Sequence, residues 1–188
     1  MNSLLCVCSF LYFCSKNQLV MTTLYLVRHG ETVDNAAQIL QGHLQGELNE
    51  RGIQQAEITR DKLKDEPIDV FVSSDLKRSV DTCRIIAAPH HKEVETTPLL
   101  RERDWGDFTG KFIPDLKDKP WPENVESLEA LKQRALKFLE FLRTSYPNKT
   151  VLAVGHGIIN KAIQSVYFHK PMGEIQKMDN AEVRIYQL

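Results

Sequence analysis

The sequence predicts a single α/β domain in which a mostly parallel sheet is flanked by helices on both faces. Short apolar runs alternate with helical repeats along the chain, and these runs are typical of strands that are buried on both faces. The composition, 42% hydrophobic and 26% charged over 188 residues, is that of one globular domain.

These patterns predict nine elements. We expect strands over 23–28, 68–73, 93–96, 151–154 and 182–187, and helices over 50–64, 76–88, 127–145 and 158–168. One face of the helix over 127–145 carries Leu128, Leu131, Ala135, Phe138 and Leu142. Residues 104–126, which are interrupted by prolines, are expected to form a long loop within the domain.

Residues 1–20 are expected to be an N-terminal extension, and residues 21–188 the domain. Met21 directly precedes the first strand, so the extension is either a start-site artefact or a disordered segment. Its apolar run from Leu4 to Phe13 has no preceding Lys or Arg and is too short to span a bilayer. A signal peptide or a membrane anchor is therefore not favoured.

Charge and cysteine content exclude several classes of partner. The chain has 24 Lys and Arg against 25 Asp and Glu, a formal charge of -1, so no global field favours nucleic acid or an anionic membrane. The cysteines show neither metal-ligand spacing nor a disulfide framework; they are Cys6, Cys8, Cys14 and Cys83. A reducing cytoplasm is the simpler location, and we expect a monomer or a homodimer.

Polar residues gather where the predicted strands end. The first strand leads into Arg28-His29-Gly30, the second into a segment that ends in Arg78, and the strand over 151–154 into Gly155-His156-Gly157. Ligands of parallel sheets bind outside the carboxyl ends of the strands. A lone histidine at a strand end is usually a core residue, but two histidines and two arginines at one edge indicate a site. We interpret His43, His90, His91 and His169 as surface residues.

These residue types fit phosphate chemistry. Guanidinium groups form forked, charge-assisted hydrogen bonds with phosphate oxygens. A neutral imidazole is a competent nucleophile, so His29 can attack phosphorus while Arg28, Arg78 and His156 stabilise the charge on the oxygens.

A leaving alkoxide needs a proton, which a carboxylic acid should supply. Glu102 is the candidate, and Asp104 and Asp107 are its rivals; the pattern alone does not rank the three.

These motifs resemble those of the histidine phosphatase superfamily, in its phosphoglycerate-mutase-like branch, from Thr23 to the C-terminus. The segments that carry the resemblance are Leu26-Val27-Arg28-His29-Gly30-Glu31-Thr32, Ser73-Ser74-Asp75-Leu76-Lys77-Arg78-Ser79 and Val154-Gly155-His156-Gly157. The resemblance implies that His29 is phosphorylated, that Arg28, Arg78 and His156 complete the phosphate pocket, and that Glu102 is the acid and base.

The resemblance also implies substrate contacts at Asn35, Gln41, Gly42 and Gly157. The chain departs from the family pattern over 107–110 and 122–127, so the substrate is not implied.

The implied activity is that of a phosphomonoester hydrolase of the histidine acid type, acting on a small phosphorylated metabolite such as α-ribazole phosphate or a sugar phosphate. The short link between Glu102 and His156 favours a phosphatase over a phosphoglycerate mutase, and a catalytically silent phosphate-binding domain is the remaining alternative. Gly155-His156-Gly157 lacks the third glycine of a dinucleotide loop, and the chain has no Gly-x-x-x-x-Gly-Lys run. We expect no cofactor and no metal.

Overall fold

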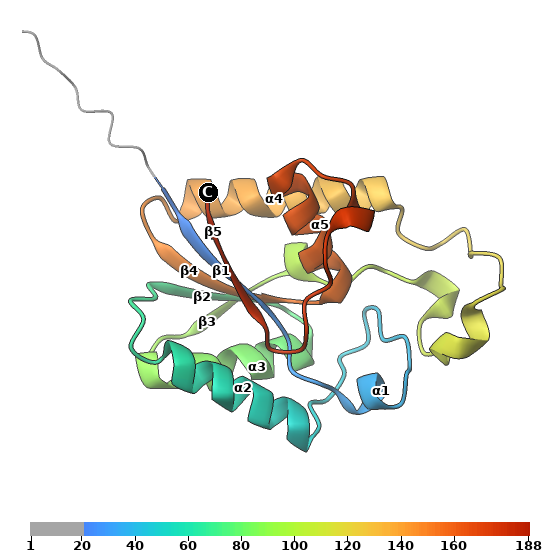
Figure 1. The fold of residues 1–188 in the computed structure, drawn as a ribbon, viewed down its shortest axis with the longest axis horizontal. Coiled ribbons are helices and arrows are strands. Elements are labelled where there is room, and N and C mark those ends of the chain that lie inside the picture. The colour runs from blue at the N-terminus through green and yellow to red at the C-terminus, as the bar shows by residue number, and fades with distance from the viewer. Residues whose placement is uncertain (1–20) are drawn as a thin grey trace, which may run out of the picture.

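The computed structural model describes residues 21–188, which form a five-stranded sheet with helices on both faces (Figure 1). The predicted extension over 1–20 lies outside the described residues. The strands are β1 (Thr23–Arg28), β2 (Val70–Ser74), β3 (Val94–Thr97), β4 (Thr150–Gly155) and β5 (Val183–Gln187). Their order is β3-β2-β4-β1-β5, and all neighbours are parallel except β1 and β5. The predicted, mostly parallel sheet is confirmed.

Helices α2 and α3 cover one face of this sheet, and α4 and α5 cover the other (Figure 1). The α-helices are α1 (Val33–Ala36), α2 (Glu50–Leu63), α3 (Lys77–Ala87), α4 (Leu128–Ser145) and α5 (Gly157–Phe168). Short 3-10 turns cover Ala88–His90, Pro98–Leu100, Gly106–Phe108, Ile113–Leu116 and Met172–Glu174. The four predicted helices are confirmed, whereas the single turn α1 was not predicted. No helix of residues 21–188 is long and apolar enough to cross a membrane.

The two faces of β1 explain why its apolar run is continuous. Leu24 and Leu26 lie in the cluster that packs against α4 and α5. Tyr25 and Val27 lie in the cluster on the side of α2 and α3. Since side chains alternate between the faces of a strand, only an uninterrupted apolar run can fill both cores.

Helix α4 buries most of its predicted face. Leu131, Ala135, Phe138 and Leu142 are buried in the core. Leu128 was predicted to share this face, but 48% of it is exposed, because it opens the helix one turn before the first core residue. Ser127 caps the helix by accepting a hydrogen bond from Ala130 N at 3.1 Å.

The predicted loop over 104–126 contains two 3-10 turns but no strand or α-helix. Its backbone pairs with residues 38–40: Leu40 N donates to Lys111 O at 2.9 Å, and Ile113 N donates to Gln38 O at 2.8 Å. The loop is thereby tied to the segment that follows α1. Both segments border the carboxyl edge of the sheet.

Candidate active site

The carboxyl ends of β1, β2 and β4 meet at one edge of the sheet, where a cavity of about 140 Å³ opens. Eight of the nine predicted site residues line it: Arg28, His29, Asn35, Gln41, Gly42, Arg78, Glu102 and Gly157. Segments that are far apart in the sequence therefore supply one site, as the strand-end argument predicts.

His29 follows β1 and is 3% exposed. Its Nδ1 lies 2.7 Å from Gly30 O, and since a carbonyl oxygen only accepts, Nδ1 carries the proton. The lone pair is then on Nε2. Burial, together with the positive charges of Arg78 and Arg28, holds the pKa of His29 well below its usual value. The imidazole is thus neutral near pH 7, which a nucleophile requires.

His156, the ninth predicted residue, is fully buried and does not line the cavity. Its ring centroid lies 5.0 Å from that of His29. Arg78 Nε donates to His156 Nδ1 at 3.1 Å, so the proton is on Nε2, which lies 3.2 Å from Ser79 Oγ. Here His156 orients the guanidinium of Arg78.

Arg78, in the first turn of α3, is 1% exposed, and nearly all of its donors are used inside the protein. Besides the contact with His156, Nη2 donates to Gly42 O at 2.9 Å and Nη1 donates to the carbonyl oxygens of Leu44 and Gln45. One Nη2 proton remains for a ligand in the cavity. Burial lowers the pKa of Arg78 to about 10, so the side chain remains cationic at neutral pH.

Arg28 is the second cation of the cavity. Its Nη1 donates to Met178 O at 2.8 Å, whereas its Nε is buried without a hydrogen-bond partner among residues 21–188. A Cβ atom at Gly157 would lie 3.7 Å from this Nε and 3.6 Å from Glu102 Oε2, so the glycine keeps the space between the two side chains open. Burial lowers the pKa of Arg28.

Glu102 lines the cavity together with Arg28, His29 and Arg78. Its Oε1 accepts from the backbone N–H groups of Arg103, Ile158 and Ile159 at 2.9–3.1 Å. Its Oε2 accepts only from Ile158 N, at 3.1 Å, and is the freer oxygen. Two of these donors belong to the first turn of α5, where helices favour a negative charge.

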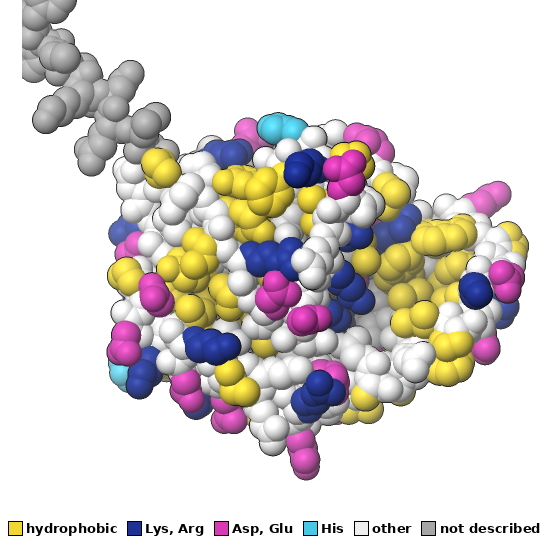
Figure 2. All heavy atoms as spheres, viewed as in Figure 1, with side chains coloured by type: hydrophobic (Ala, Val, Ile, Leu, Met, Phe, Trp, Pro, Cys, Tyr) yellow, Lys and Arg dark blue, Asp and Glu magenta, His cyan; other side chains and the backbone are white. Residues whose placement is uncertain are grey.

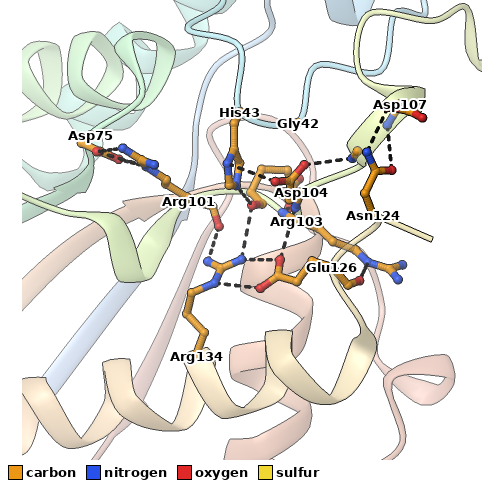
Figure 3. Close-up of polar contacts among 12 residues, drawn as sticks. Gly42, His43, Asp75, Arg101, Arg103, Asp104, Asp107, Asn124, Glu126 and Arg134 are labelled. Atoms are coloured by element: carbon orange, nitrogen blue, oxygen red, sulfur yellow. Dashed lines mark hydrogen bonds and ion pairs between the residues drawn. The ribbon is translucent and has the colours of Figure 1, made fainter. Parts of the chain in front are cut away.

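The rival carboxylates point elsewhere. Asp104 Oδ1 accepts from Gly106 N at 2.9 Å, and Asp107 Oδ1 accepts from Asn124 Nδ2 at 2.9 Å (Figure 3). Neither residue lines the cavity. Position therefore separates Glu102 from Asp104 and Asp107, which the sequence pattern did not.

Arg134, on helix α4, holds the backbone of Glu102. Arg134 donates to the carbonyl oxygens of Leu99, Arg101 and Glu102, and its Nε and Nη2 form a forked pair with the carboxylate of Glu126 at 3.1 and 2.7 Å. All five of its N–H donors are used. We call Arg134 and its partners the carbonyl clamp.

His43 is also linked to this backbone. Its Nε2 donates to Glu102 O at 2.9 Å, and its Nδ1 lies 3.8 Å from Asp104 Oδ2. The sequence argument treated His43 as a surface residue, and about a third of its side chain, 36%, is exposed. The contact arises because the turn after Gly42 packs on the Glu102 loop, a pairing that no local pattern signals.

Asn35 and Gln41 form the rim beside His29. Thr32 caps α1 by accepting from Asn35 N at 3.0 Å and also accepts from Gln41 Nε2 at 2.7 Å. Gln41 Oε1 is buried against Gly46 and has no hydrogen-bond partner among the described residues. Gly42 contributes its carbonyl oxygen, which fixes Arg78.

Lys177 lines the cavity but was not predicted. Ala181 N, four residues later, donates to Arg28 O at 2.9 Å, which fastens this segment to the end of β1. Because β5 is antiparallel to β1, the residues before β5 reach the carboxyl edge of the sheet. If the last strand had been predicted to run antiparallel to the first, the residues before it, including Lys177, would have been expected at the carboxyl edge of the sheet.

The cavity thus joins three cationic side chains, an imidazole with a free Nε2 and a carboxylate, which suits a phosphoryl group. In the part of the chain that the structure describes, no three His, Cys, Asp or Glu side chains are grouped to hold a metal ion.

Comparison with known proteins gives consistent matches. The model of the histidine phosphatase superfamily (branch 1) matches residues 24–188. An uncharacterized phosphatase, PhoE, of Bacillus subtilis is 39% identical over 73% of this chain and 72% of its own. A metal-independent phosphoserine phosphatase of Arabidopsis thaliana is 34% identical over 76% of this chain and 67% of its own. A mycobacterial glucosyl-3-phosphoglycerate phosphatase has a similar structure, with a TM-score of 0.81 and 27% identity, over 87% of this chain and 91% of that one.

Proposed function

The chain belongs to branch 1 of the histidine phosphatase superfamily, and on that premise we propose that it is a metal-independent phosphomonoester hydrolase that acts through a phosphohistidine. The relatives named as phosphatases support hydrolysis as the reaction class. The observation that carries the mechanism is the free Nε2 of buried, neutral His29, which lines the same cavity as Glu102, Arg28 and Arg78.

In the first step, His29 Nε2 attacks phosphorus in line. The N–P bond forms as the ester P–O bond breaks, and the electron pair of that bond moves to the leaving oxygen. Glu102 supplies the proton that this oxygen needs. In the second step, Glu102 takes a proton from water, the water oxygen attacks phosphorus, and the electron pair of the N–P bond returns to Nε2.

The arginines stabilise the charge that spreads over the phosphoryl oxygens in both steps. Arg78 keeps one Nη2 proton for this purpose, and Arg28 donates only through Nη1 to residues 21–188, so its Nη2 protons remain for the phosphoryl oxygens. Both guanidinium groups are anchored on backbone carbonyl oxygens, so they need little reorganisation when the charge develops.

The proposed substrate is a small phosphorylated metabolite of the α-ribazole phosphate or sugar phosphate type. The proposed setting is the cytoplasm, with a monomer or homodimer and without nucleic acid, membrane or cofactor. The formal charge of -1 supports the absence of polyanionic partners.

The test is phosphate release by the purified protein with a chelator present. The substrates are p-nitrophenyl phosphate, α-ribazole phosphate, sugar phosphates and 3-phosphoglycerate. We expect metal-independent release. Absence of release from every ester would overturn the proposal; phosphoryl transfer between phosphoglycerates would then identify a mutase, and its absence a silent binding domain.

A further inference from the structure

An apolar groove of about 560 Å³ continues from the phosphate-binding cavity. The cavity and the groove share three lining residues, Leu40, Trp105 and Ile113. The remaining walls are Phe108, Pro114, Leu116, Lys117 and Trp121. In Figure 2, hydrophobic side chains gather on the right of the molecule, where Figure 1 draws the loop over 104–126, next to Lys and Arg side chains. The groove is therefore the direction in which a group attached to a bound phosphate would extend.

The aromatic wall of the groove is held in place from behind. The guanidinium carbon of Arg103 lies 4.8 Å from the ring centroid of Trp105 and 4.9 Å from that of Trp121. Arg103 is itself buried, and its Nε donates to Glu126 O at 2.7 Å. The two indole rings lie 5.7 Å apart. Cation–π contacts with an anchored guanidinium thus preorganise two aromatic walls whose ring planes are inclined at 49° to each other.

These walls are left open to solvent. Trp121 is 60% exposed and Ile113 is 47% exposed. Large apolar side chains that gather around a groove are typical of a binding site. The volume of the groove lies within the range of about 300–1,000 Å³ that is usual for small-molecule sites. Its continuity with the cavity favours the substrate, rather than a second protein, as the occupant.

The scarcity of charged and polar side chains in the groove limits the class of ligand that it can bind. Lys117 is the one charged residue among the lining residues, and no carboxylate or amide side chain lines it. An apolar ring would be stabilised by leaving water for these walls, whereas the hydroxyl groups of a sugar would find few partners there, namely Lys117 and the indole N–H groups.

We propose that this groove binds the alcohol part of the substrate, so that the preferred substrates are phosphomonoesters of alcohols that carry an apolar, aromatic ring system. This inference rests on the proposed function, because it takes the phosphate to be bound between Arg28 and Arg78. It narrows the substrate class to esters in which a flat ring system extends from the phosphate past Trp105.

The test compares phenyl phosphate with 2-naphthyl phosphate, whose leaving alcohols differ little in acidity but differ by one ring. For the wild-type protein we expect kcat/KM to be about tenfold higher for the naphthyl ester, mainly through a lower KM, since the second ring leaves water in the groove. Equal values for the two esters would overturn the inference. So would a preference for O-phosphoserine over phenyl phosphate at equal concentration.

The variant Trp121→Ala tests whether the preference for the naphthyl ester arises in this groove. It should bring the naphthyl to phenyl ratio of kcat/KM close to one. The matched control is Phe168→Ala, because Phe168 is also an exposed aromatic residue, at 48%, and packs on two rings on α5 and β5. The control should keep the wild-type ratio. An unchanged ratio in Trp121→Ala would contradict the assignment to this groove.

Binding to His29→Ala separates failure of this inference from failure of the proposed function. Calorimetry with the two esters needs no turnover and should give an about tenfold lower Kd for 2-naphthyl phosphate. If His29→Ala shows this selectivity but the wild-type protein releases no phosphate, the groove is supported as a binding site and the proposed hydrolase activity is refuted. Release without selectivity in either assay would support the hydrolase and refute the groove.

Discussion

The two ends of the active-site cleft are built differently. The phosphate end consists of His29 and Arg78, which are 3% and 1% exposed and lie at the ends of a strand and a helix. The groove end consists of loop residues such as Ile113 and Trp121, which are 47% and 60% exposed. The comparison shows that His29 and Arg78 are packed into the core, whereas Ile113 and Trp121 lie on its rim.

Burial explains this division. A buried guanidinium must have its donors satisfied, and the partners of Arg78 come from Gly42, Leu44, Gln45 and His156. Changing one of these partners would leave a buried polar group without a hydrogen bond. Trp121 is not a buried polar group that needs hydrogen-bond partners, so residues of the groove can be substituted without loss of the phosphate site.

His29→Ala tests the phosphate end and should have the largest effect. We expect phosphate release to fall by about 10⁴-fold or more, because no other side chain in the cavity offers an equivalent nucleophile. Steady-state kinetics with p-nitrophenyl phosphate measures the loss, and circular dichroism confirms that the variant is folded. Full activity in a folded His29→Ala protein would overturn the covalent mechanism.

Glu102→Gln tests the residue that stands between the two ends. Hydrolysis of an alkyl phosphate should fall by about 10²–10⁴-fold, because an alkoxide needs a proton from Glu102. Formation of the phosphohistidine from p-nitrophenyl phosphate, whose leaving group needs no proton, should change far less. A burst of p-nitrophenol in rapid mixing reports that step. An equal loss with both esters would exclude Glu102 as the acid.

Arg134→Lys tests whether the carbonyl clamp positions Glu102 for its role as the acid. A lysine cannot bind three carbonyl oxygens and a carboxylate together, so Glu102 should lose its position. We expect an about tenfold lower kcat for an alkyl phosphate and little change in the p-nitrophenol burst. Arg143→Lys, an exposed position on the same helix, is the control. A uniform loss with both esters would indicate a purely structural role.

Lowering the pH should reduce the free energy of unfolding, and this is the smallest of the expected effects. The pKa values of His29 and His156 lie well below their usual value in the folded protein, chiefly through burial. Below pH about 6.5 the unfolded chain therefore binds protons that the folded chain does not. The free energy of unfolding should fall with pH by up to about 1.4 kcal/mol per unit for each histidine.

Urea denaturation at pH 7, 6 and 5 measures this slope. His156→Gln removes one of the two groups and should make the slope shallower than in the wild-type protein. A wild-type slope in that variant would show that His156 is not the titrating group.

The sequence predicted the strands and the longer helices because each is an apolar pattern of a definite period. It also predicted eight of the fourteen residues that line the cavity, since strand ends and motifs are local features. It missed Lys177, whose position depends on the antiparallel pairing of β5 with β1. It also missed the contact of His43 with Glu102 O, which joins residues 59 positions apart.

By itself, the sequence determined the fold class, the family and the residue types of the phosphate end, because these follow from periodicity and short motifs. Only the tertiary structure placed His156 behind Arg78 and showed that Glu102 lines the cavity whereas Asp104 and Asp107 do not. It also assembled Leu40, Trp105 and Trp121 into one groove. These arrangements depend on how loops pack on one another, and a loop carries no periodic signal from which its partners could be inferred.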